Sequence, residues 1–315
     1  MIIYRTKDEP KDIKIEKIYT NDQYSVVSNS YEQNLSGIKF FKYADDIGYP
    51  LSLKNNLIQD TINFGGKTIS NEDFVLIAGP CSAESVNQIV STAKFMKDLG
   101  VQYFRAGCFK PRTKPYTFQG LGEDGLKLVS EVCKEYDLKF VSEVRDFSNL
   151  SSVIEYADVV QVGSKCMYDT GVLKELGGTS KSVLLKRHFG ATLKEFLQAA
   201  DFILSSGNTN IALCERGIRS FENDTRFTLD SCGIEWLKEN SWIPIIGDPS
   251  HALGSTYGIE GLALSMISQK VNGLIIEVHP KPEIALSDSS QQLNFDEYSN
   301  LYSKMNKLRK FVLSL

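Results

Sequence analysis

Several features that would indicate a membrane, secreted or nucleic-acid-binding protein are absent from this sequence. No apolar run reaches the roughly 18 residues that a transmembrane helix needs. The first segment, MIIYRTKDEPKDIKIEK, acquires charges within five residues and lacks the apolar core of a signal peptide. The formal net charge is −4 and the pI is near 5.6, which argues against non-specific nucleic-acid binding. We therefore expect a cytoplasmic protein without a membrane or nucleic-acid partner.

A disulfide framework is also absent. The six cysteines lie far apart, at positions 81, 108, 133, 166, 214 and 232, without the spacing of a small disulfide-rich domain. We interpret them as reduced thiols, any of which could bind a metal. The composition, 42% hydrophobic and 23% charged, is typical of a globular protein with a sizeable core.

From about residue 74, short apolar runs alternate with segments of helical periodicity such as ATLKEFLQAADFILSSG, which ends in a C-cap glycine. The expected strands are FVLIAG (74–79), YFRAG (103–107), KFVSEV (139–144), VVQVG (159–163), SVLLKR (182–187), NIALCER (210–216), IPIIGD (243–248) and GLIIEV (273–278). Eight apolar strands separated by helices predict an α/β fold, and their number favours a (β/α)₈ TIM barrel. A dinucleotide-binding open sheet is less favoured, because no GxGxxG follows the first strand.

Residues 1–70 differ in character from the rest of the chain. They are polar, rich in Asn, Ser, Tyr and Lys, and lack the alternating pattern of strands and helices. We interpret them as an N-terminal extension of uncertain structure, which ends in a strand or hairpin (TINFGGKTI) at the barrel floor. The predicted domains are this extension (1–70) and the barrel (71–315).

Four chemically distinctive residues follow strands that become neighbours when such a barrel closes. Cys81 lies in GPCS after the first strand, and His251 lies in DPSH after the seventh. Glu277 is carried by the eighth strand, and Asp288 lies in the loop beyond it. Because the active sites of these barrels form at the carboxyl ends of the strands, the four side chains can converge. A thiol, an imidazole and two carboxylates suit Zn²⁺, Mn²⁺, Fe²⁺ or a similar divalent ion.

Each of these residues also has a purely structural interpretation. A single cysteine at a strand end is more often packed than bound to a metal, and Asp288 could be a helix N-cap. The set is more informative than its members, because the predicted fold brings together residues some 200 positions apart. Spacing alone nevertheless leaves metal binding open.

Positive charge is concentrated at the other strand ends. The cations are Arg105, Lys110 and Arg112 at the second strand, Lys165 at the fourth, Lys186 and Arg187 at the fifth, and Arg216 at the sixth. One interpretation is a set of salt bridges with Glu143, Glu215 and Glu277 on the same rim. The interpretation that we favour is a pocket for phosphates and carboxylates, in which arginine supplies bidentate geometry and lysine a point charge.

Nine motifs in order resemble those of a known family: GPCS, FRAGCFKPRT, FQGLGEDGLK, SEV, LLKR, LCERGIRSFE, DPSH, EVHP and ALSD. They resemble the type I 3-deoxy-D-arabino-heptulosonate 7-phosphate (DAHP) synthases, of the β subgroup that includes relatives of 3-deoxy-D-manno-octulosonate 8-phosphate (KDO8P) synthase. The resemblance covers roughly residues 74–295. It implies a transferase of the shikimate pathway, which condenses phosphoenolpyruvate with erythrose 4-phosphate to give DAHP and phosphate.

The resemblance also implies residue roles. The implied metal ligands are Cys81, His251, Glu277 and Asp288; the implied phosphoenolpyruvate contacts are Arg105, Lys110, Lys165, Lys186 and Arg216; and the implied sugar-phosphate site is Pro111, Arg112 and Thr113. The catalytic candidates are Lys110 as proton donor, Glu143 as holder of the attacking water, and His279 of EVHP. We expect a divalent ion (Mn²⁺, Zn²⁺, Fe²⁺ or Co²⁺), no organic cofactor, and a homo-oligomer, either a dimer or a tetramer.

The sequence departs from the family pattern at several places. Lys165 stands where many members have an arginine on the phosphate of phosphoenolpyruvate, so that the charge is kept and the bidentate fork is lost. The loop after DPSH reads ALGSTYGIE and has fewer cations than usual, and residues 1–70 resemble neither the ferredoxin-like nor the chorismate mutase domain found in this subgroup. These departures leave two alternative functions open: a synthase for another aldose phosphate, and a non-catalytic sensor of phosphorylated metabolites. The intact metal ligands and lysines favour the enzyme.

Overall fold

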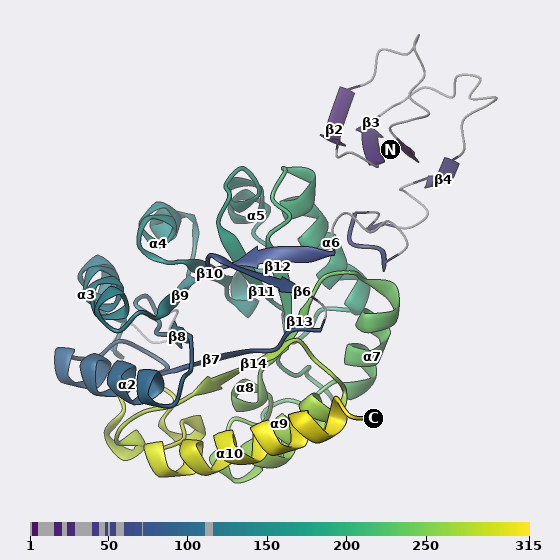
Figure 1. Ribbon diagram of the computed structural model, residues 1–315. Coiled ribbons are helices and arrows are strands. Elements are labelled where there is room, and N and C mark those ends of the chain that lie inside the picture. Colours follow the sequence, from purple (N-terminus) through teal and green to yellow (C-terminus); the bar gives the residue numbers. More distant parts are fainter. Residues whose placement is uncertain are drawn as a thin grey trace.

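The computed structural model describes residues 2–5, 16–20, 24–28, 40–43, 48–49, 51–54, 60–70, 72–110 and 116–315. Its largest part is a closed barrel of eight parallel strands, which follow one another around the barrel in chain order (Figure 1). The strands are β7 (Val75–Gly79), β8 (Tyr103–Arg105), β9 (Lys139–Val144), β10 (Val159–Val162), β11 (Ser182–Lys186), β12 (Ile211–Glu215), β13 (Ile245–Gly247) and β14 (Gly273–Glu277). The barrel closes where β14 pairs with β7.

Helices surround this barrel on the outside (Figure 1). They are α2 (Val86–Asp98), α3 (Gly122–Glu135), α4 (Leu150–Tyr156), α5 (Thr170–Gly177), α6 (Leu193–Ser205), α7 (Ser231–Asn240), α8 (Pro249–Leu253), α9 (Ile259–Ser268) and α10 (Phe295–Val312). Every residue of β11, β12 and β14 is buried, as expected for a parallel sheet covered on both faces. The predicted (β/α)₈ barrel is therefore confirmed, and the predicted strand ends agree to within two residues.

Local sequence explains the ends of individual helices. Helix α6 begins with a capping box, in which Thr192 accepts from the backbone of Glu195 and the Glu195 side chain accepts from the backbone of Thr192. The helix ends at Ser205, shortly before Gly207. Gly207 has a φ of 110°, which suits glycine, and it is the residue that the sequence predicted at the end of this helix. The same device starts α10, where Asn294 and Glu297 form a second capping box.

Before the barrel, four strands form an antiparallel sheet in the order β2-β3-β1-β4. They are β1 (Ile2–Arg5), β2 (Glu16–Thr20), β3 (Tyr24–Ser28) and β4 (Phe40–Tyr43). A hairpin of β5 (Thr61–Phe64) and β6 (Lys67–Ser70) follows. Its turn contacts the amino-terminal ends of barrel strands: Gly65 N donates to Ser182 Oγ at 2.8 Å, and the Tyr103 hydroxyl donates to the Phe64 carbonyl at 2.8 Å. The predicted division at residue 70 stays a prediction.

Among the described residues, no helix combines the length and the apolar character needed to cross a membrane. All six cysteines fall in this described part, and all are free thiols. Five of them are buried and only Cys232 is exposed.

A candidate active site at the carboxyl ends of the barrel strands

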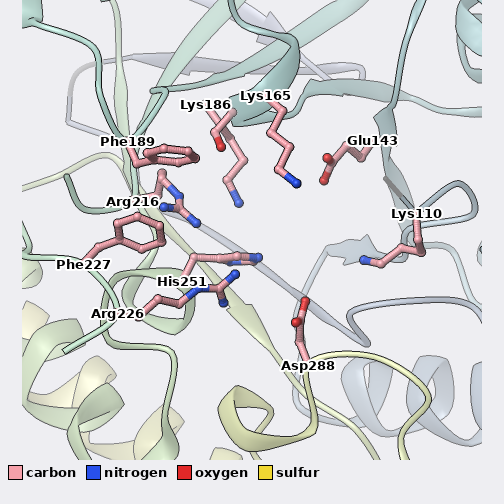
Figure 2. A pocket seen from close by; sticks show the side chains of 11 residues that line it. Lys110, Glu143, Lys165, Lys186, Phe189, Arg216, Arg226, Phe227, His251 and Asp288 are labelled. Carbon is pink, nitrogen blue, oxygen red and sulfur yellow. The ribbon is translucent and has the colours of Figure 1, made fainter. Parts of the chain in front are cut away.

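A cavity of about 250 Å³ opens at the carboxyl ends of the strands. Predicted site residues that line it are Lys110, Glu143, Lys165, Lys186, Arg216, His251 and Asp288, and they are joined by Ser164, Phe189, Arg226 and Phe227. Figure 2 shows side chains from opposite sides of the barrel pointing into one shared space, with the two phenylalanine rings on one wall. The strand-end positions chosen from the sequence therefore do meet around one cavity.

Three of the four predicted metal ligands lie together at this cavity. The ligand atoms of Cys81, Glu277 and Asp288 all lie within 4.8 Å of one another. The Cys81 thiol donates to Asp288 Oδ2 at 3.2 Å. Barrel closure explains the cluster, because Glu277 on the last strand is paired in register with Gly79 on the first. Cys81 follows that pair by two residues.

The backbone before Cys81 requires a glycine. Gly79 has a φ of 148°, and a Cβ at this position would overlap the carbonyl oxygen of Arg105. The absence of a side chain therefore lets the ends of β7 and β8 approach each other. In this arrangement Arg105 Nη2 donates to the Cys81 carbonyl at 3.0 Å.

The fourth predicted ligand, His251, lies in the short helix α8 and outside the three-residue cluster. Asp248 caps this helix: it accepts from His251 N at 3.0 Å, and its Oδ2 lies 2.8 Å from His251 Nδ1. Burial opposes ionisation of Asp248, but contacts with His251 and Lys186 outweigh it and hold the pKa of Asp248 well below its usual range. Since an ionised carboxylate only accepts, Nδ1 carries the proton and Nε2 is left free, 3.5 Å from Glu277 Oε1. Burial lowers the pKa of His251, which favours the neutral form that binds metals.

The four residues fit a divalent cation. Glu277 Oε1 is buried without a hydrogen-bond partner in the described part of the chain, although Arg105 Nη1 lies 2.9 Å away in a poorly aligned ion pair. Burial and Glu277 raise the pKa of the Cys81 thiol to about 12, so that a nearby cation is needed to hold the thiolate. A buried oxygen without a donor and a thiol beside two carboxylates are what a metal site provides before it binds an ion.

Part of the positive charge on the rim is already paired within the protein. Arg187 Nη1 lies 2.9 Å from Glu215 Oε2 and 2.8 Å from Asp230 Oδ2. Arg105 pairs with Glu277, as noted above. For Arg187 and Arg105, the salt-bridge interpretation of the sequence is therefore correct. Arg105 is also not among the described residues that line the cavity.

Other cations remain available to a ligand. Arg216 is buried, and its Nε and Nη1 have no hydrogen-bond partner among the described residues, while its guanidinium lies 4.3 Å from the centre of the Phe227 ring. Lys165 is exposed in the cavity and makes no ion pair within that part of the chain. Lys110 Nζ donates to Cys81 Sγ at 3.0 Å and also lines the cavity. An unpaired buried guanidinium is costly unless an anion meets it, so this side of the cavity suits phosphate or carboxylate.

Of the remaining predicted site residues, one lines the cavity, one lies outside it, and three lie outside the described residues. Glu143 is half-buried in the cavity and accepts from Gln161 Nε2 at 2.6 Å; a Cβ at Gly163 would overlap it. His279 is buried outside the residues that line the cavity, where its Nδ1 accepts from Lys281 N at 3.0 Å. The predicted sugar-phosphate residues Pro111, Arg112 and Thr113 lie outside the described residues.

Sequence reasoning missed several residues at the site. Asp248 belongs to the DPSH motif, and its N-cap position before His251 was a usable signal. Arg226 and Phe227 lie on the long loop after β12, where no strand-end rule points to them. Phe189 stacks on Phe227 with ring centres 5.2 Å apart, a pairing that only the folded loops reveal.

The pairing of Arg187 leads to a stability prediction. Arg187→Met should lower the free energy of unfolding by about 3–5 kcal/mol, because it leaves the fully buried Glu215 without its cation. Urea denaturation measures this. Arg219→Met is the control, since Arg219 is exposed over the Phe189 ring and should cost less than about 1 kcal/mol. Equal stability of the two variants would show that the buried pair does not matter.

Together, the barrel and the site define a class: a (β/α)₈ protein with a cation-lined cavity suited to phosphate or carboxylate beside a candidate metal centre. The family model of the DAHP synthetase I family matches residues 52–314, and the chain belongs to this family. The family predicted from the sequence motifs is thereby confirmed.

Similar proteins agree with this membership. The chain is 44% identical over 251 residues to a phospho-2-dehydro-3-deoxyheptonate aldolase of Thermotoga maritima, covering 79% of this chain and 74% of that protein. A crystal structure of a phospho-2-dehydro-3-deoxyheptonate aldolase (DAHP synthase) from Thermotoga maritima matches with a TM-score of 0.82 and 34% identity, over 99% of this chain and 97% of the other. A 2-dehydro-3-deoxyphosphooctonate aldolase of Arabidopsis thaliana is 29% identical, over 70% of this chain and 83% of that protein.

Proposed function

We propose that this protein is a metal-dependent DAHP synthase. It condenses phosphoenolpyruvate with erythrose 4-phosphate to give DAHP and phosphate, the first step of the shikimate pathway. Family membership and the 44% identical heptonate aldolase bear out the predicted reaction class. The observation that carries the metal-dependent form is the meeting of Cys81, Glu277 and Asp288 beside a cavity lined by unpaired cations.

The reaction forms one carbon–carbon bond and one carbon–oxygen bond to water, and it breaks the carbon–oxygen bond to phosphate. C3 of phosphoenolpyruvate bonds to the aldehyde carbon of the sugar phosphate, and the aldehyde oxygen takes up a proton. Water adds at C2, and phosphate leaves from the same carbon. A divalent ion held by the Cys81 cluster and His251 would supply Lewis acidity at the aldehyde oxygen.

We assign the proton to Lys110. Burial lowers the pKa of Lys110, but Cys81 and Glu143 more than offset this, so that its pKa is raised and the amine stays protonated. Figure 2 shows its side chain directed toward Asp288 across the cavity. A protonated amine at this position can donate to the oxygen that becomes the new hydroxyl.

The unpaired cations hold the anionic groups of phosphoenolpyruvate. Arg216 and Lys165 offer free donors to phosphate or carboxylate, and Lys186 stands beside them, although its Nζ also lies 2.5 Å from Asp248 Oδ2. Their positive charge stabilises the negative charge that grows as phosphate departs. Glu143 holds the attacking water with the carboxylate oxygen that Gln161 does not occupy.

The finer parts of this proposal concern the ion, the assembly and the location. The ion is Mn²⁺, Zn²⁺, Fe²⁺ or Co²⁺, since a mixed set of sulfur, nitrogen and oxygen ligands suits each of them. The active form is a homo-oligomer in the cytoplasm, and no organic cofactor takes part. The second candidate substrate is a five-carbon aldose phosphate, because the octonate aldolases that resemble the chain make an eight-carbon acid.

A substrate panel tests the proposed function. Phosphate release is measured with phosphoenolpyruvate, Mn²⁺ and one aldose phosphate at a time, of four or five carbons. We expect the highest kcat/KM with erythrose 4-phosphate. Turnover with five-carbon sugars alone would assign the chain to the octonate branch. Binding of phosphoenolpyruvate without any phosphate release would identify a sensor.

Lys165 tests the position of the phosphoenolpyruvate phosphate. Lys165→Ala should raise the KM for phosphoenolpyruvate about tenfold, because a charge-assisted contact in the cavity is lost. Lys165→Arg should keep the KM or lower it by up to about fivefold, since a fork can bind phosphate bidentately. Steady-state kinetics measure both variants, with Lys194→Ala on the exposed surface of α6 as the charge-matched control. An unchanged KM in Lys165→Ala would remove this residue from the site.

A further inference from the structure

The segment after Asp288 folds back alongside the end of β14. Asp288 has a φ of 44°, in the left-handed region, and the 3₁₀ turn η7 (Ser289–Gln291) begins there. Leu293 N then donates to the Glu277 carbonyl at 2.9 Å, and His279 N donates to the Leu293 carbonyl at 2.9 Å. This return places two consecutive buried glutamines, 291 and 292, against the metal-ligand cluster.

The Gln291 amide bridges a carboxylate and a guanidinium. Its Nε2 donates to Glu277 Oε2 at 2.6 Å, and its Oε1 accepts from Arg226 Nη1 at 2.6 Å. A carboxylate can only accept and a guanidinium can only donate, so both contacts fix which way the amide points. Among the neutral polar side chains, an amide is well suited to satisfy both partners at once.

The Gln292 amide holds a second residue of the cluster. Its Oε1 accepts from Cys81 N at 2.9 Å, and its Nε2 donates to the Ser287 carbonyl at 2.8 Å. The backbone of Cys81, just after the first barrel strand, is thereby tied to the residue that precedes Asp288. Gln292 is 0% exposed, so no water competes for these bonds.

These contacts decide which ligand atoms are left free. With Oε2 of Glu277 engaged by Gln291, it is Oε1 that remains without a hydrogen-bond partner in the described part of the chain. With the Cys81 backbone fixed by Gln292, the Cys81 thiol stays 3.2 Å from Asp288 Oδ2. The cluster consists of the Cys81 thiol, one carboxylate oxygen of Asp288 and one of Glu277, and the two glutamines leave Glu277 Oε1 available for that role.

We propose that Gln291 and Gln292 are positioning residues that set the affinity and geometry of the metal site. The inference rests on the proposed function, since it takes the Cys81, Glu277 and Asp288 cluster as the metal centre. Neither amide needs to touch the ion or the substrates. Each holds a ligand, as the outer partners of metal ligands do in other proteins.

The test is a titration of the metal-free protein with Co²⁺, followed by thiolate-to-cobalt absorption in the near ultraviolet and by the visible bands. Gln291→Met keeps the side-chain length and removes both hydrogen bonds of the side-chain amide. It should raise the Kd for Co²⁺ about 10- to 100-fold and alter the visible bands. Gln292→Met should act in the same direction. Gln269→Met is the matched control, because the Gln269 amide binds the Ser231 carbonyl far from the cluster and should leave Co²⁺ binding unchanged.

Thermal unfolding without metal separates positioning from folding. A Gln291→Met protein that unfolds near the wild-type temperature and binds Co²⁺ weakly supports the inference. A folded Gln291→Met protein whose Kd stays within about threefold of wild type, with unchanged bands, would overturn it. If wild type itself binds no Co²⁺, the metal-dependent form of the proposed function fails and the inference fails with it. If wild type binds Co²⁺ and the Gln291→Met protein binds it equally well, the inference fails and the proposed function stands.

Discussion

Treatment with a chelator should abolish phosphate release from phosphoenolpyruvate and erythrose 4-phosphate, and added Mn²⁺, Co²⁺ or Zn²⁺ should restore it. The physical reason is the cluster of Cys81, Glu277 and Asp288, whose ligand atoms lie within 4.8 Å of one another and suit a divalent ion. Without an ion, the aldehyde oxygen lacks its Lewis acid, which supplies several kcal/mol of stabilisation. Turnover is measured after dialysis against chelator and again after each ion is added back. Full activity in metal-free buffer would refute all four ligand assignments together.

Cys81→Ser isolates one ligand of the four. A hydroxyl replaces a soft thiolate, so metal affinity should fall by at least about tenfold. Cys133→Ser is the matched control, because Cys133 is buried in α3 and undergoes the same chemical change away from the cluster. The control should lose some stability and keep its metal. Equal metal affinity of the two variants would show that the Cys81 sulfur is not a ligand.

A second large effect is expected at Asp248. Asp248→Asn should lower kcat/KM at least about 100-fold, because one carboxylate orients His251 and also pairs with Lys186. An amide can present its NH₂ group to His251 Nδ1, which favours the wrong tautomer and leaves the buried lysine without its anion. Metal affinity and kcat/KM are measured on the same preparation.

The control for Asp248 is a half-buried carboxylate that also accepts backbone hydrogen bonds. Asp201 on α6 accepts from the backbone of Leu51 at 3.0 Å and of Ser52 at 2.9 Å, far from the metal ligands along the chain. Asp201→Asn should lower the thermal stability and leave kcat/KM unchanged. An Asp248→Asn enzyme that resembles this control would mean that His251 needs no orienting carboxylate.

The barrel could be predicted from the sequence because its strands are continuous apolar runs, which can be recognised without knowing which strands pair. The sequence was also sufficient to place Cys81 beside Glu277, since both lie at or just after the ends of two barrel strands that pair when the barrel closes. It could not say which cations are paired. Arg187 and Lys186 are adjacent in sequence, yet one turns to Glu215 and the other faces the cavity, a choice made by strand pleating and by loops that fold over the rim.

Residues supplied by loops were the least predictable. Arg226 reaches the cavity from a long connection, and Gln291 returns to it after a turn at a left-handed aspartate. Neither position follows from periodicity, because a loop has none. Asp248 was more predictable, because an N-cap aspartate three residues before a candidate ligand histidine lies next to that histidine in the folded helix.

The pairing of β14 with β7 has a consequence for folding during synthesis on the ribosome. Cys81 leaves the ribosome early, but its partners at 277 and 288 are synthesised some 200 residues later. The three residues of the cluster therefore cannot meet until the last barrel strand has docked beside the first. Pairing so distant in sequence is slow to form, since the long intervening chain must be ordered first. The proposed metal centre is thus complete only in a finished barrel, and loading is expected to follow folding rather than precede it.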